Sequence, residues 1–204
     1  MNAIRSIDFF DRQFRQQAQD RRYQLNPFEQ AALPYLSGRV LDLGCGMGNL
    51  AFAAAARGCT VLALDASPAG VAHIRQRAAS ESAPVEAVLA DLGDYEIQGD
   101  FDAVVAIGLL MFFDCPTALR TLAHLQAHVG EGSIAVVNVL IEGTTYLEMF
   151  DPARYCLFAR AELESRFAGW DILQSQASEF DAPGGTLKRF STLIARKRRA
   201  QTGR

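Results

Sequence analysis

The segment VLDLGCGMGNL (residues 40–50) decides the fold. Its apolar start leads to Asp42, and glycines follow at Gly44, Gly46 and Gly48. Glycine tolerates positive φ and lets another group approach the backbone closely, so glycine at every second position is typical of a ligand-binding turn. A short apolar run that ends in such a turn, with an Ala-rich segment after it, predicts a buried strand, a tight loop and a helix.

The same alternation continues along the chain. Short apolar runs predict strands at residues 39–44, 60–65, 85–92, 101–108, 133–140, 170–180 and 186–197. Helical periodicity and caps predict helices at residues 49–58, 67–80, 116–130 and 159–169. The last two strands are joined only by the turn DAPGG, which predicts an antiparallel pair. The sequence therefore predicts an α/β, doubly wound, Rossmann-like seven-stranded sheet, mainly parallel with an antiparallel C-terminal hairpin.

Both ends of the chain are predicted to lie outside this sheet. A helix over residues 4–17 places Ile7, Phe10 and Phe14 on one side. That apolar side has two equally supported interpretations, because it can cover the open end of a pocket or pack on the sheet. The expected organisation is an N-terminal lid segment at residues 1–25, the main domain at 26–197 and a basic, solvated tail at 198–204.

Composition argues against several kinds of partner. The chain has 204 residues, half of them hydrophobic, and a formal net charge of −3. This charge does not attract nucleic acid, and the longest apolar stretch, residues 103–113, is too short to cross a bilayer. The charged N-terminal segment does not resemble a signal peptide. Because no CxxC spacing occurs, we expect reduced thiols in a cytoplasmic protein at Cys45, Cys59, Cys115 and Cys156.

The glycine spacing indicates which ligand the loop binds. Nicotinamide and flavin sites use GxGxxG, but Asn49 stands where the last glycine of that pattern would be. The chain has GxGxG instead, which suits S-adenosylmethionine, a cofactor without a pyrophosphate. Asp65 ends the second strand, where it can accept hydrogen bonds from the ribose hydroxyls. Asp91 ends the third, where it can accept from the adenine amino group while the Leu92 N–H donates to the ring. The expected cofactor-binding residues are Asp42, Gly44, Cys45, Gly46, Gly48, Asp65, Ala66, Asp91, Leu92 and Ile107.

Three motifs of the chain resemble those of a known family. VLDLGCGMGNL, VLALDAS (residues 61–67) and AVLADL (residues 87–92) are similar to motifs of the class I S-adenosylmethionine-dependent methyltransferases, over roughly residues 23–197. Within that family the chain is most similar to the tellurite-resistance methyltransferase group. The segments that carry this second resemblance are RYQL (residues 22–25), LLMFF (109–113), FARAELESRFAGW (158–170) and RFSTLIARK (189–197).

The resemblance implies methyl transfer to a small-molecule acceptor. A soft chalcogen or thiol acceptor needs no general base, whereas an oxygen or nitrogen acceptor usually does. The group places an aromatic residue near the methyl and a basic residue toward the acceptor, and Tyr23 and Arg189 match these positions. The group's His-Arg pair is missing from QASEFD (residues 176–181), so the resemblance covers the cofactor site better than the acceptor side.

The sequence also allows an alternative function and contains residues that other chemistries use. A methyltransferase-like module that binds the cofactor without catalysis is the alternative from another functional class. His124 and His128 are four residues apart, a spacing that a metal site can use, but no third ligand accompanies them and we expect no metal. Cys45 is expected to pack in the loop rather than act as a nucleophile, because this chemistry needs no covalent enzyme intermediate.

Overall fold

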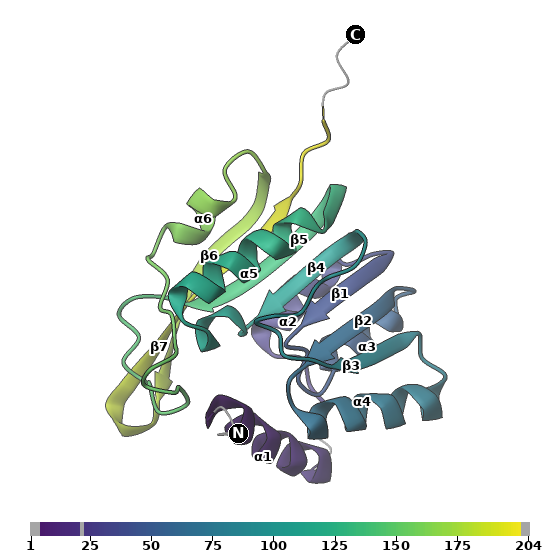
Figure 1. Ribbon diagram of the computed structural model, residues 1–204, viewed down its shortest axis with the longest axis horizontal. Helices are drawn as coiled ribbons and strands as arrows, with labels where there is room; N and C mark the ends of the chain where they lie inside the picture. Colours follow the sequence, from purple (N-terminus) through teal and green to yellow (C-terminus); the bar gives the residue numbers. More distant parts are fainter. Residues whose placement is uncertain (1–4, 21–22, 201–204) are drawn as a thin grey trace.

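The computed structural model describes residues 5–20 and 23–200, and a seven-stranded sheet organises them (Figure 1). The strands run in the order β3-β2-β1-β4-β5-β7-β6. Their bounds are β1 Arg39–Leu43, β2 Thr60–Asp65, β3 Val85–Leu89, β4 Phe101–Ile107, β5 Val129–Leu140, β6 Asp171–Ala182 and β7 Thr186–Arg196. Strands β1 to β5 pair in parallel, while β7 pairs antiparallel with both β5 and β6. The predicted fold class is confirmed, including the antiparallel hairpin at one edge.

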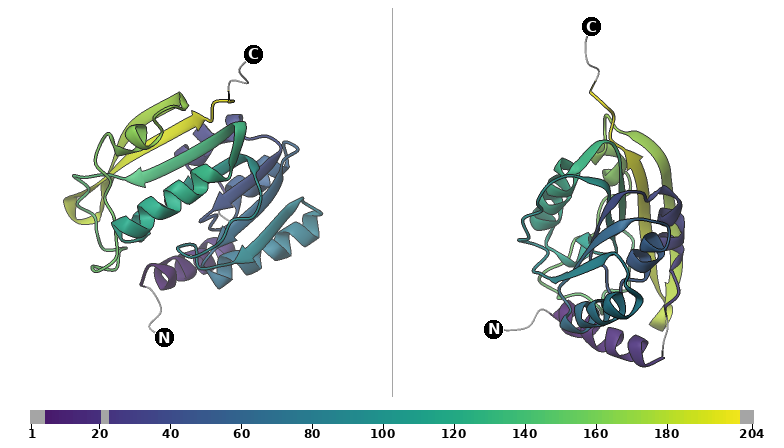
Figure 2. Two further views of the ribbon diagram at one scale, coloured as in Figure 1. Left: turned by 45° about the horizontal axis from the view of Figure 1, so that its top comes forward. Right: turned by 90° about the vertical axis from the view of Figure 1, so that its right-hand side faces the viewer.

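Helices cover both faces of this sheet, and one further helix lies beyond its end. Their bounds are α1 Arg5–Asp20, α2 Pro27–Ala32, α3 Asn49–Ala55, α4 Pro68–Glu81, α5 Cys115–Ala127 and α6 Glu162–Arg166, with short 3-10 turns η1 Leu33–Tyr35, η2 Leu110–Phe112 and η3 Pro183–Gly185. Figure 2 shows from two sides that α1 stays beside α4 at one end of the molecule. This is the end toward which the parallel strands run (Figure 1).

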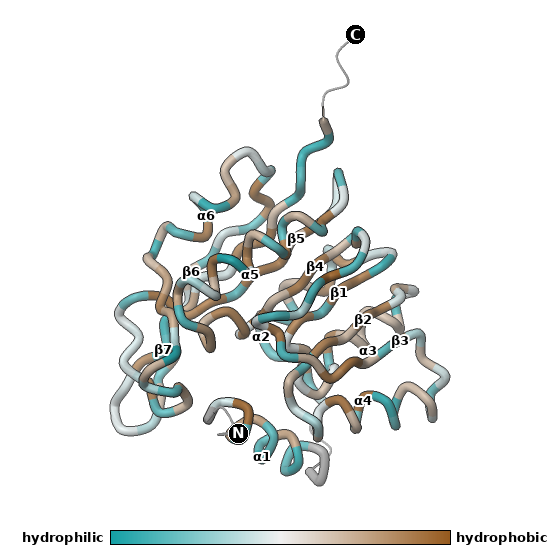
Figure 3. Tube along the Cα trace, in the orientation of Figure 1, coloured by the Kyte–Doolittle hydropathy of each residue, from teal (hydrophilic) through white to brown (hydrophobic). Residues whose placement is uncertain are grey.

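Two hydrophobic clusters hold the layers together, one on each face of the sheet. On one face, α5 and α6 contribute residues such as Leu122 and Leu163. On the other, α3 and α4 contribute residues such as Leu50 and Ile74. The strands between them are apolar on both sides, as a covered parallel sheet requires, and the hydrophobic colour in Figure 3 follows the central strands.

The helix α2 is not among the predicted elements. Its start carries a complete capping box, because the Asn26 side chain accepts from the backbone N–H of Phe28 and Glu29 while the Glu29 carboxylate accepts from the backbone N–H of Asn26. Pro27 stands at the first helical position. Asparagine, proline and then glutamate at N3 are a recognised start signal for a helix. The start signal is therefore present in the sequence, but a helix of only six residues is too short to show the apolar periodicity that predicts a helix.

Some predicted boundaries differ from the structure. The third strand ends at Leu89 rather than residue 92, so Asp91 lies on the loop that follows. The fifth strand begins at Val129, earlier than predicted, and α6 is shorter than the predicted helix at 159–169. The predicted N-terminal helix is present as α1, with its first residue, Ile4, outside the described residues. The predicted tail falls partly outside them as well, at residues 201–204.

The cysteine prediction is wrong for one pair. Cys115, the first residue of α5, forms a disulfide with Cys156, 41 residues further along the chain. Cys45 and Cys59 are free and buried. Spacing in the sequence did not indicate this bond, because the loop after β5 returns to the start of α5 only in the folded chain. The Cys156 N–H also donates to the Met111 carbonyl, which ties the same loop to η2.

Candidate functional site

The glycine loop joins β1 to α3 at the carboxyl edge of the sheet. Gly44, Gly46 and Gly48 all have positive φ, at 71°, 56° and 72°. The N–H groups of Gly44 and Cys45 both donate to the Leu64 carbonyl, which fixes the loop against β2. Residues other than glycine rarely adopt this conformation, so the alternating glycines are explained by backbone geometry.

Gly48 has a different role from the other two glycines. It precedes α3 as its N-cap, and a methyl group added to it would lie 2.8 Å from the Ile74 side chain of α4. This glycine therefore permits close packing of the loop against α4. Gly44 and Gly46, in contrast, line the cavities described below.

Asp65, at the end of β2, organises the loop from the neighbouring strand. One of its carboxylate oxygens accepts from the Gly46 N–H at 2.8 Å and the other from the Ser67 N–H at 2.8 Å. Burial raises the pKa of Asp65, although these hydrogen bonds oppose the rise. Each oxygen keeps a second lone pair, so the carboxylate can also accept from a ligand hydroxyl.

Asp42 and Glu29 place a second pair of acidic side chains beside the loop. Asp42 is 5% exposed, and within the described residues no hydrogen bond reaches its carboxylate. Burial, with repulsion from Glu29 and Asp65, raises the pKa of Asp42 to about 8. Burial also raises the pKa of Glu29. A nearby cation stabilises the ionised form of acids that repel one another. S-adenosylmethionine, the cofactor predicted from the sequence, carries two positive groups, an ammonium and a sulfonium.

A smaller cavity of about 120 Å³ lies at the ends of β2, β3 and β4. It brings together Asp65, Ala66, Asp91 and Leu92, four of the predicted cofactor-binding residues. Asp65 is predicted to contact the ribose, and Asp91 and Leu92 the adenine. Apolar residues after β4, among them Leu109, close the opposite wall. Asp91 is exposed, and its carboxylate accepts from the Gly93 N–H at 3.1 Å.

A larger cavity of about 470 Å³ lies beside it, between the glycine loop, α1, α2 and the start of β7. Asp42, Cys45, Gly46 and Ile107 line it, all of them predicted cofactor-binding residues. Burial raises the pKa of the Cys45 thiol well above its ordinary value, so Cys45 is neutral. The two cavities meet at residues that line both, namely Gly44, Gly108, Phe10, Phe14 and Phe112.

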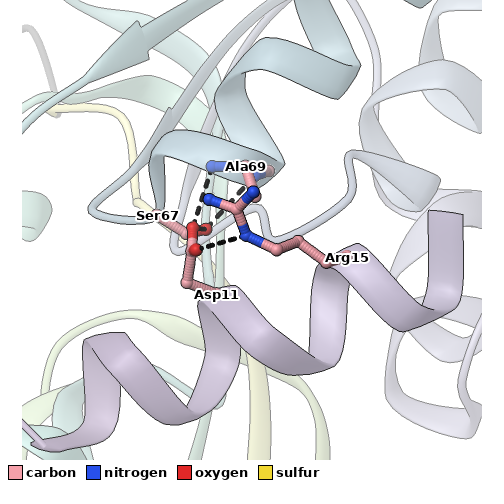
Figure 4. A network of polar contacts seen from close by, with 5 residues as sticks. Asp11, Arg15, Ser67 and Ala69 are labelled. Atoms are coloured by element: carbon pink, nitrogen blue, oxygen red, sulfur yellow. Dashed lines mark hydrogen bonds and ion pairs between the residues drawn. The ribbon is translucent and has the colours of Figure 1, made fainter.

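The helix α1 is anchored to α4 at the edge of this site (Figure 4). One oxygen of Asp11 accepts from the Ser67 hydroxyl at 2.7 Å and from the Ala69 N–H at 2.9 Å, and the other pairs with Arg15. Burial would raise the pKa of Asp11, but the hydrogen bonds outweigh it and lower the pKa. A carboxylate at the first turn of α4 is also favoured by the helix dipole.

Aromatic side chains on α1 point from this anchor into the site. A methyl group on Gly46 would lie 3.1 Å from the Phe14 ring, and Phe10 packs on both Phe14 and Phe112. Of the two interpretations of the N-terminal helix, the structure therefore favours the first, since α1 lines both cavities instead of packing on a face of the sheet.

The two predicted acceptor-side residues do not line either cavity. The Tyr23 ring is 37% exposed and stacks on His73, on the outer side of α4. Arg189 pairs with Glu179 of the neighbouring strand at 2.6 Å. Side chains alternate along a strand, and the residues of β7 on either side of Arg189, Lys188 and Phe190, are the ones that line the larger cavity.

The two histidines with a metal-compatible spacing, His124 and His128, have no third ligand among residues 5–20 and 23–200. No group of three or more His, Cys, Asp or Glu side chains is arranged to hold a metal ion there. His124 and His128 contact each other, and the His124 ring accepts from the Ile97 N–H. In the same part of the chain, no helix is both long and apolar enough to cross a membrane.

Comparison with known proteins connects this geometry to a family. Residues 40–132 match the family described as a methyltransferase domain. The chain is 28% identical over 165 residues to hemagglutinin 1 of Eikenella corrodens, covering 78% of this chain and 54% of that protein. It is 24% identical over 167 residues to the probable S-adenosyl-L-methionine-dependent methyltransferase TehB of Haemophilus influenzae strain 10810, covering 78% of this chain and 57% of the relative.

The fold comparison agrees with the sequence comparison. The crystal structure of TehB from Haemophilus influenzae matches with a TM-score of 0.73 at 21% identity, over 85% of this chain and 63% of that one. The chain thus spans little more than half the length of these curated relatives. The sequence-based prediction of a resemblance is confirmed by the matching domain and the shared fold, since residues 40–132 match a methyltransferase domain and the chain is similar to class I S-adenosylmethionine-dependent methyltransferases, TehB among them.

Proposed function

We propose that this chain transfers a methyl group from S-adenosylmethionine to a small-molecule acceptor with a soft nucleophile, such as a thiol. The observation that carries the proposal is the pair of connected cavities that meet at Gly44 and Gly108. One is lined by the acids predicted to hold adenosine, and the other joins the glycine loop to a space with an aromatic wall and several polar side chains. A cofactor that spans both would present its reactive end to that space.

The residues present fit this cofactor. The buried, unpaired carboxylate of Asp42 and the nearby Glu29 offer negative charge where the methionine ammonium would lie. Asp65 offers free lone pairs to the ribose hydroxyls, and Asp91 is exposed beside Leu92 for the adenine. Gly46, which lines the larger cavity, leaves room for the methionine portion.

The protein's contribution is to position reactants and exclude water. The bound cofactor supplies an electrophilic methyl group on a sulfonium. Holding donor and acceptor in line at near-attack distance contributes roughly 7–11 kcal/mol to such a reaction. We assign water exclusion to α1, which acts as a lid because Asp11 anchors it to α4 and its rings lie over the loop. Asp42 and Glu29 stabilise the cationic cofactor.

The walls of the larger cavity support a soft acceptor. Among the described residues that line it there is no histidine, and its titratable groups are Glu29, Asp42, Cys45, Tyr146 and Lys188. We assign the two carboxylates to the cofactor, and the Cys45 thiol is neutral. A nucleophile that ionises readily, such as a thiol, reacts without a general base, whereas an alcohol or amine would need one. TehB, with which this chain shares its fold, belongs to the group whose resemblance suggested a chalcogen acceptor.

A panel of acceptors with labelled S-adenosylmethionine tests the proposal. We expect labelled methyl to appear on an organic thiol, and less or none on a matched phenol or amine. Cofactor binding without transfer to any thiol, selenite, tellurite, phenol or amine would indicate a non-catalytic binding module instead. Preference for the phenol or amine would agree with methyltransferase activity but would contradict the proposed thiol-type acceptor.

A further inference from the structure

The wall of the larger cavity carries information about the acceptor beyond its nucleophile. This inference rests on the proposed function and concerns the same site. Most of the wall facing away from the glycine loop is apolar or aromatic, and it is formed by Phe9, Phe28, Met111, Tyr146, Met149 and Phe190. The rest of the lining is more polar and includes Gln13, Gln17, Gln24, Asn26 and Asn49. A cavity of several hundred Å³ that combines an apolar, aromatic wall with polar groups is typical of sites for organic ligands. A small inorganic oxyanion would lose its hydration there without covering the apolar surface.

Two polar side chains at this wall, Lys188 and Asn138, each keep a polar atom without a hydrogen-bond or ion-pair partner among the described residues. Lys188 is half-buried and its Nζ lies 4.5 Å from the centre of the Tyr146 ring. Within the described residues it forms no ion pair and no side-chain hydrogen bond, and burial lowers its pKa. An ammonium group held over an aromatic ring, without a carboxylate beside it, is suited to receive an anion from a ligand.

Asn138 is the second polar group, at the end of β5. Its side chain is completely buried, and its amide nitrogen donates to the Thr192 hydroxyl at 2.8 Å. Its amide oxygen has no hydrogen-bond partner, although Asn138 lines the larger cavity. A buried amide with an unmet hydrogen bond is costly, and a ligand that supplies the missing partner would remove that cost. Because the Thr192 hydroxyl can donate or accept, the amide can present its oxygen to a thiol or its N–H to a thiolate.

The sheet sets the separation and order of these two groups. The Asn138 carbonyl accepts from the Gly108 N–H, and Gly108 lines both cavities, so Asn138 lies at their junction. Thr192, its partner across the strands, and Lys188 are four residues apart on β7, which corresponds to roughly 13 Å of strand. Thr192, Phe190 and Lys188 lie on the same side of β7, since side chains alternate along a strand. Phe190 lies between the two polar groups.

We propose that the acceptor is an organic acid with an apolar, aromatic body, whose nucleophilic group meets Asn138 and whose anionic group meets Lys188. The reactive end then lies at the junction with the cofactor, the body covers Phe190 and the facing aromatic side chains, and the charge is satisfied at the far end. The acceptor class follows from this arrangement of two unsatisfied groups separated by an apolar surface.

A matched pair of acceptors tests the anionic end. With labelled S-adenosylmethionine, we compare kcat/KM for 4-mercaptophenylacetate and for 4-methylbenzenethiol, which share the thiol and the ring and differ in the carboxylate. The protein should prefer the acid at least tenfold. Lys188→Met should abolish that preference by raising KM for the acid, with the rate on the neutral thiol and the cofactor affinity kept within about twofold.

Arg189→Met is the control for charge. This variant removes a cation from the adjacent position of β7, on the opposite side of the strand, where Arg189 pairs with Glu179. It should keep the preference for the acid. Loss of the preference in Arg189→Met, or an equal loss on both thiols in Lys188→Met, would overturn the assignment of Lys188.

The reactive end is tested with Asn138→Leu, which keeps the side-chain volume and removes the unmet hydrogen bond. We expect kcat to fall at least tenfold on both thiols while the melting temperature does not fall. Unchanged kcat would overturn the contact at Asn138. Transfer to tellurite but to neither thiol would overturn the acceptor class and leave the proposed function standing. Transfer to no probe at all would overturn both.

Discussion

The cofactor side and the acceptor side of this site are built in different ways. The cofactor side comes from the ends of β1, β2, β3 and β4 and the loops that follow them, so residues within a few positions of a strand end supply its glycines and acids. The acceptor side combines α1, α2 and β7, which lie far apart in the sequence. The shape of the cofactor side is determined mainly by the local backbone conformation, whereas the shape of the acceptor side is determined by the packing of segments that are distant in the sequence. A family motif therefore identifies the cofactor, while only the folded chain identifies the acceptor's surroundings.

The largest effect is expected from Gly46→Val, which tests the local side. Gly46 has a φ of 56° and a new side chain would meet the Phe14 ring, so the variant is both strained and blocked. We expect cofactor binding to be lost in a calorimetric titration while circular dichroism shows a folded protein. Gly58→Ala provides the control, because Gly58 has a φ of 92° but nothing within 4 Å of an added methyl group. Normal affinity in a folded Gly46→Val would contradict the loop assignment.

Removal of the disulfide tests the assembled side. Cys115→Ala combined with Cys156→Ala removes a link across 41 residues, and such a loss typically costs about 2–4 kcal/mol of unfolding free energy. Because Cys156 also contacts Met111, which lines the larger cavity, KM for the acceptor should rise while cofactor affinity is kept. Denaturant unfolding and steady-state kinetics measure the two effects. A change in cofactor affinity with an unchanged KM for the acceptor would show that the disulfide supports the cofactor side rather than the acceptor side.

Asp65→Ala is expected to weaken cofactor binding by roughly 1.5–3 kcal/mol, the range for hydrogen bonds to a charged group. The variant removes the acceptor for the ribose hydroxyls and also releases the N–H groups of Gly46 and Ser67. The dissociation constant of the cofactor is the measurement. Asp94→Ala, an exposed acid near the same edge, should leave it unchanged. If Asp65→Ala bound the cofactor normally, the role of Asp65 would be limited to its hydrogen bonds with the backbone of Gly46 and Ser67.

The smallest effect is a dependence of cofactor affinity on pH. A cation binds the ionised form of Asp42, whose pKa is raised to about 8, so binding below that pH must displace a proton. Affinity should rise with pH, by up to about tenfold per unit for a single proton, and level off above pH 8. Titrations from pH 6 to 9 measure it, and Asp42→Asn should flatten the profile.

Stability of the cofactor-free protein should change in the opposite direction. The pKa of Asp42 is higher in the folded chain than its ordinary value of 3.8, so the native state holds more protons than the unfolded state between these values. The free energy of unfolding should therefore fall as pH rises from about 4 to 8. Raised pKa values at Glu29 and Asp65 act with the same sign. Stability that rose over this range would show that Asp42 is not the dominant group.

The sequence predicted the sheet and the cofactor residues because both depend on local patterns. Each buried strand is a short apolar run, and the positive φ of Gly44 and Gly46 is a property of single positions. Asn26 and Glu29 also gave a local signal, a capping box, but a helix of six residues left no periodicity to accompany it. The charge of Glu29 beside Asp42 could not be predicted, because it depends on where α2 packs.

The acceptor side could not be predicted, for two physical reasons. The disulfide between Cys115 and Cys156 joins segments whose approach depends on the loop after β5. The choice between Lys188 and Arg189 depends on which side of β7 faces the cavity, and long-range hydrogen bonds fix that side. The backbone N–H of Arg189 donates to the Thr144 hydroxyl, and the backbone N–H of Leu187 donates to the Thr145 hydroxyl. Both bonds join β7 to the loop after β5.

The alternation along β7 also means that the register of this strand decides which cation faces the larger cavity. Two cations stand side by side, and their surroundings differ completely, because one pairs with Glu179 and the other lies over Tyr146. A one-residue insertion or deletion in the turn at Pro183–Gly185 that shifted β7 would exchange lysine for arginine at the cavity without changing the composition of the strand. Such a shift would also turn the buried side chains of β7 to the opposite face of the sheet, including Leu193 and Ile194, which pack in the clusters on its two sides. The packing of the core and the identity of the cation at the cavity therefore depend on the same register.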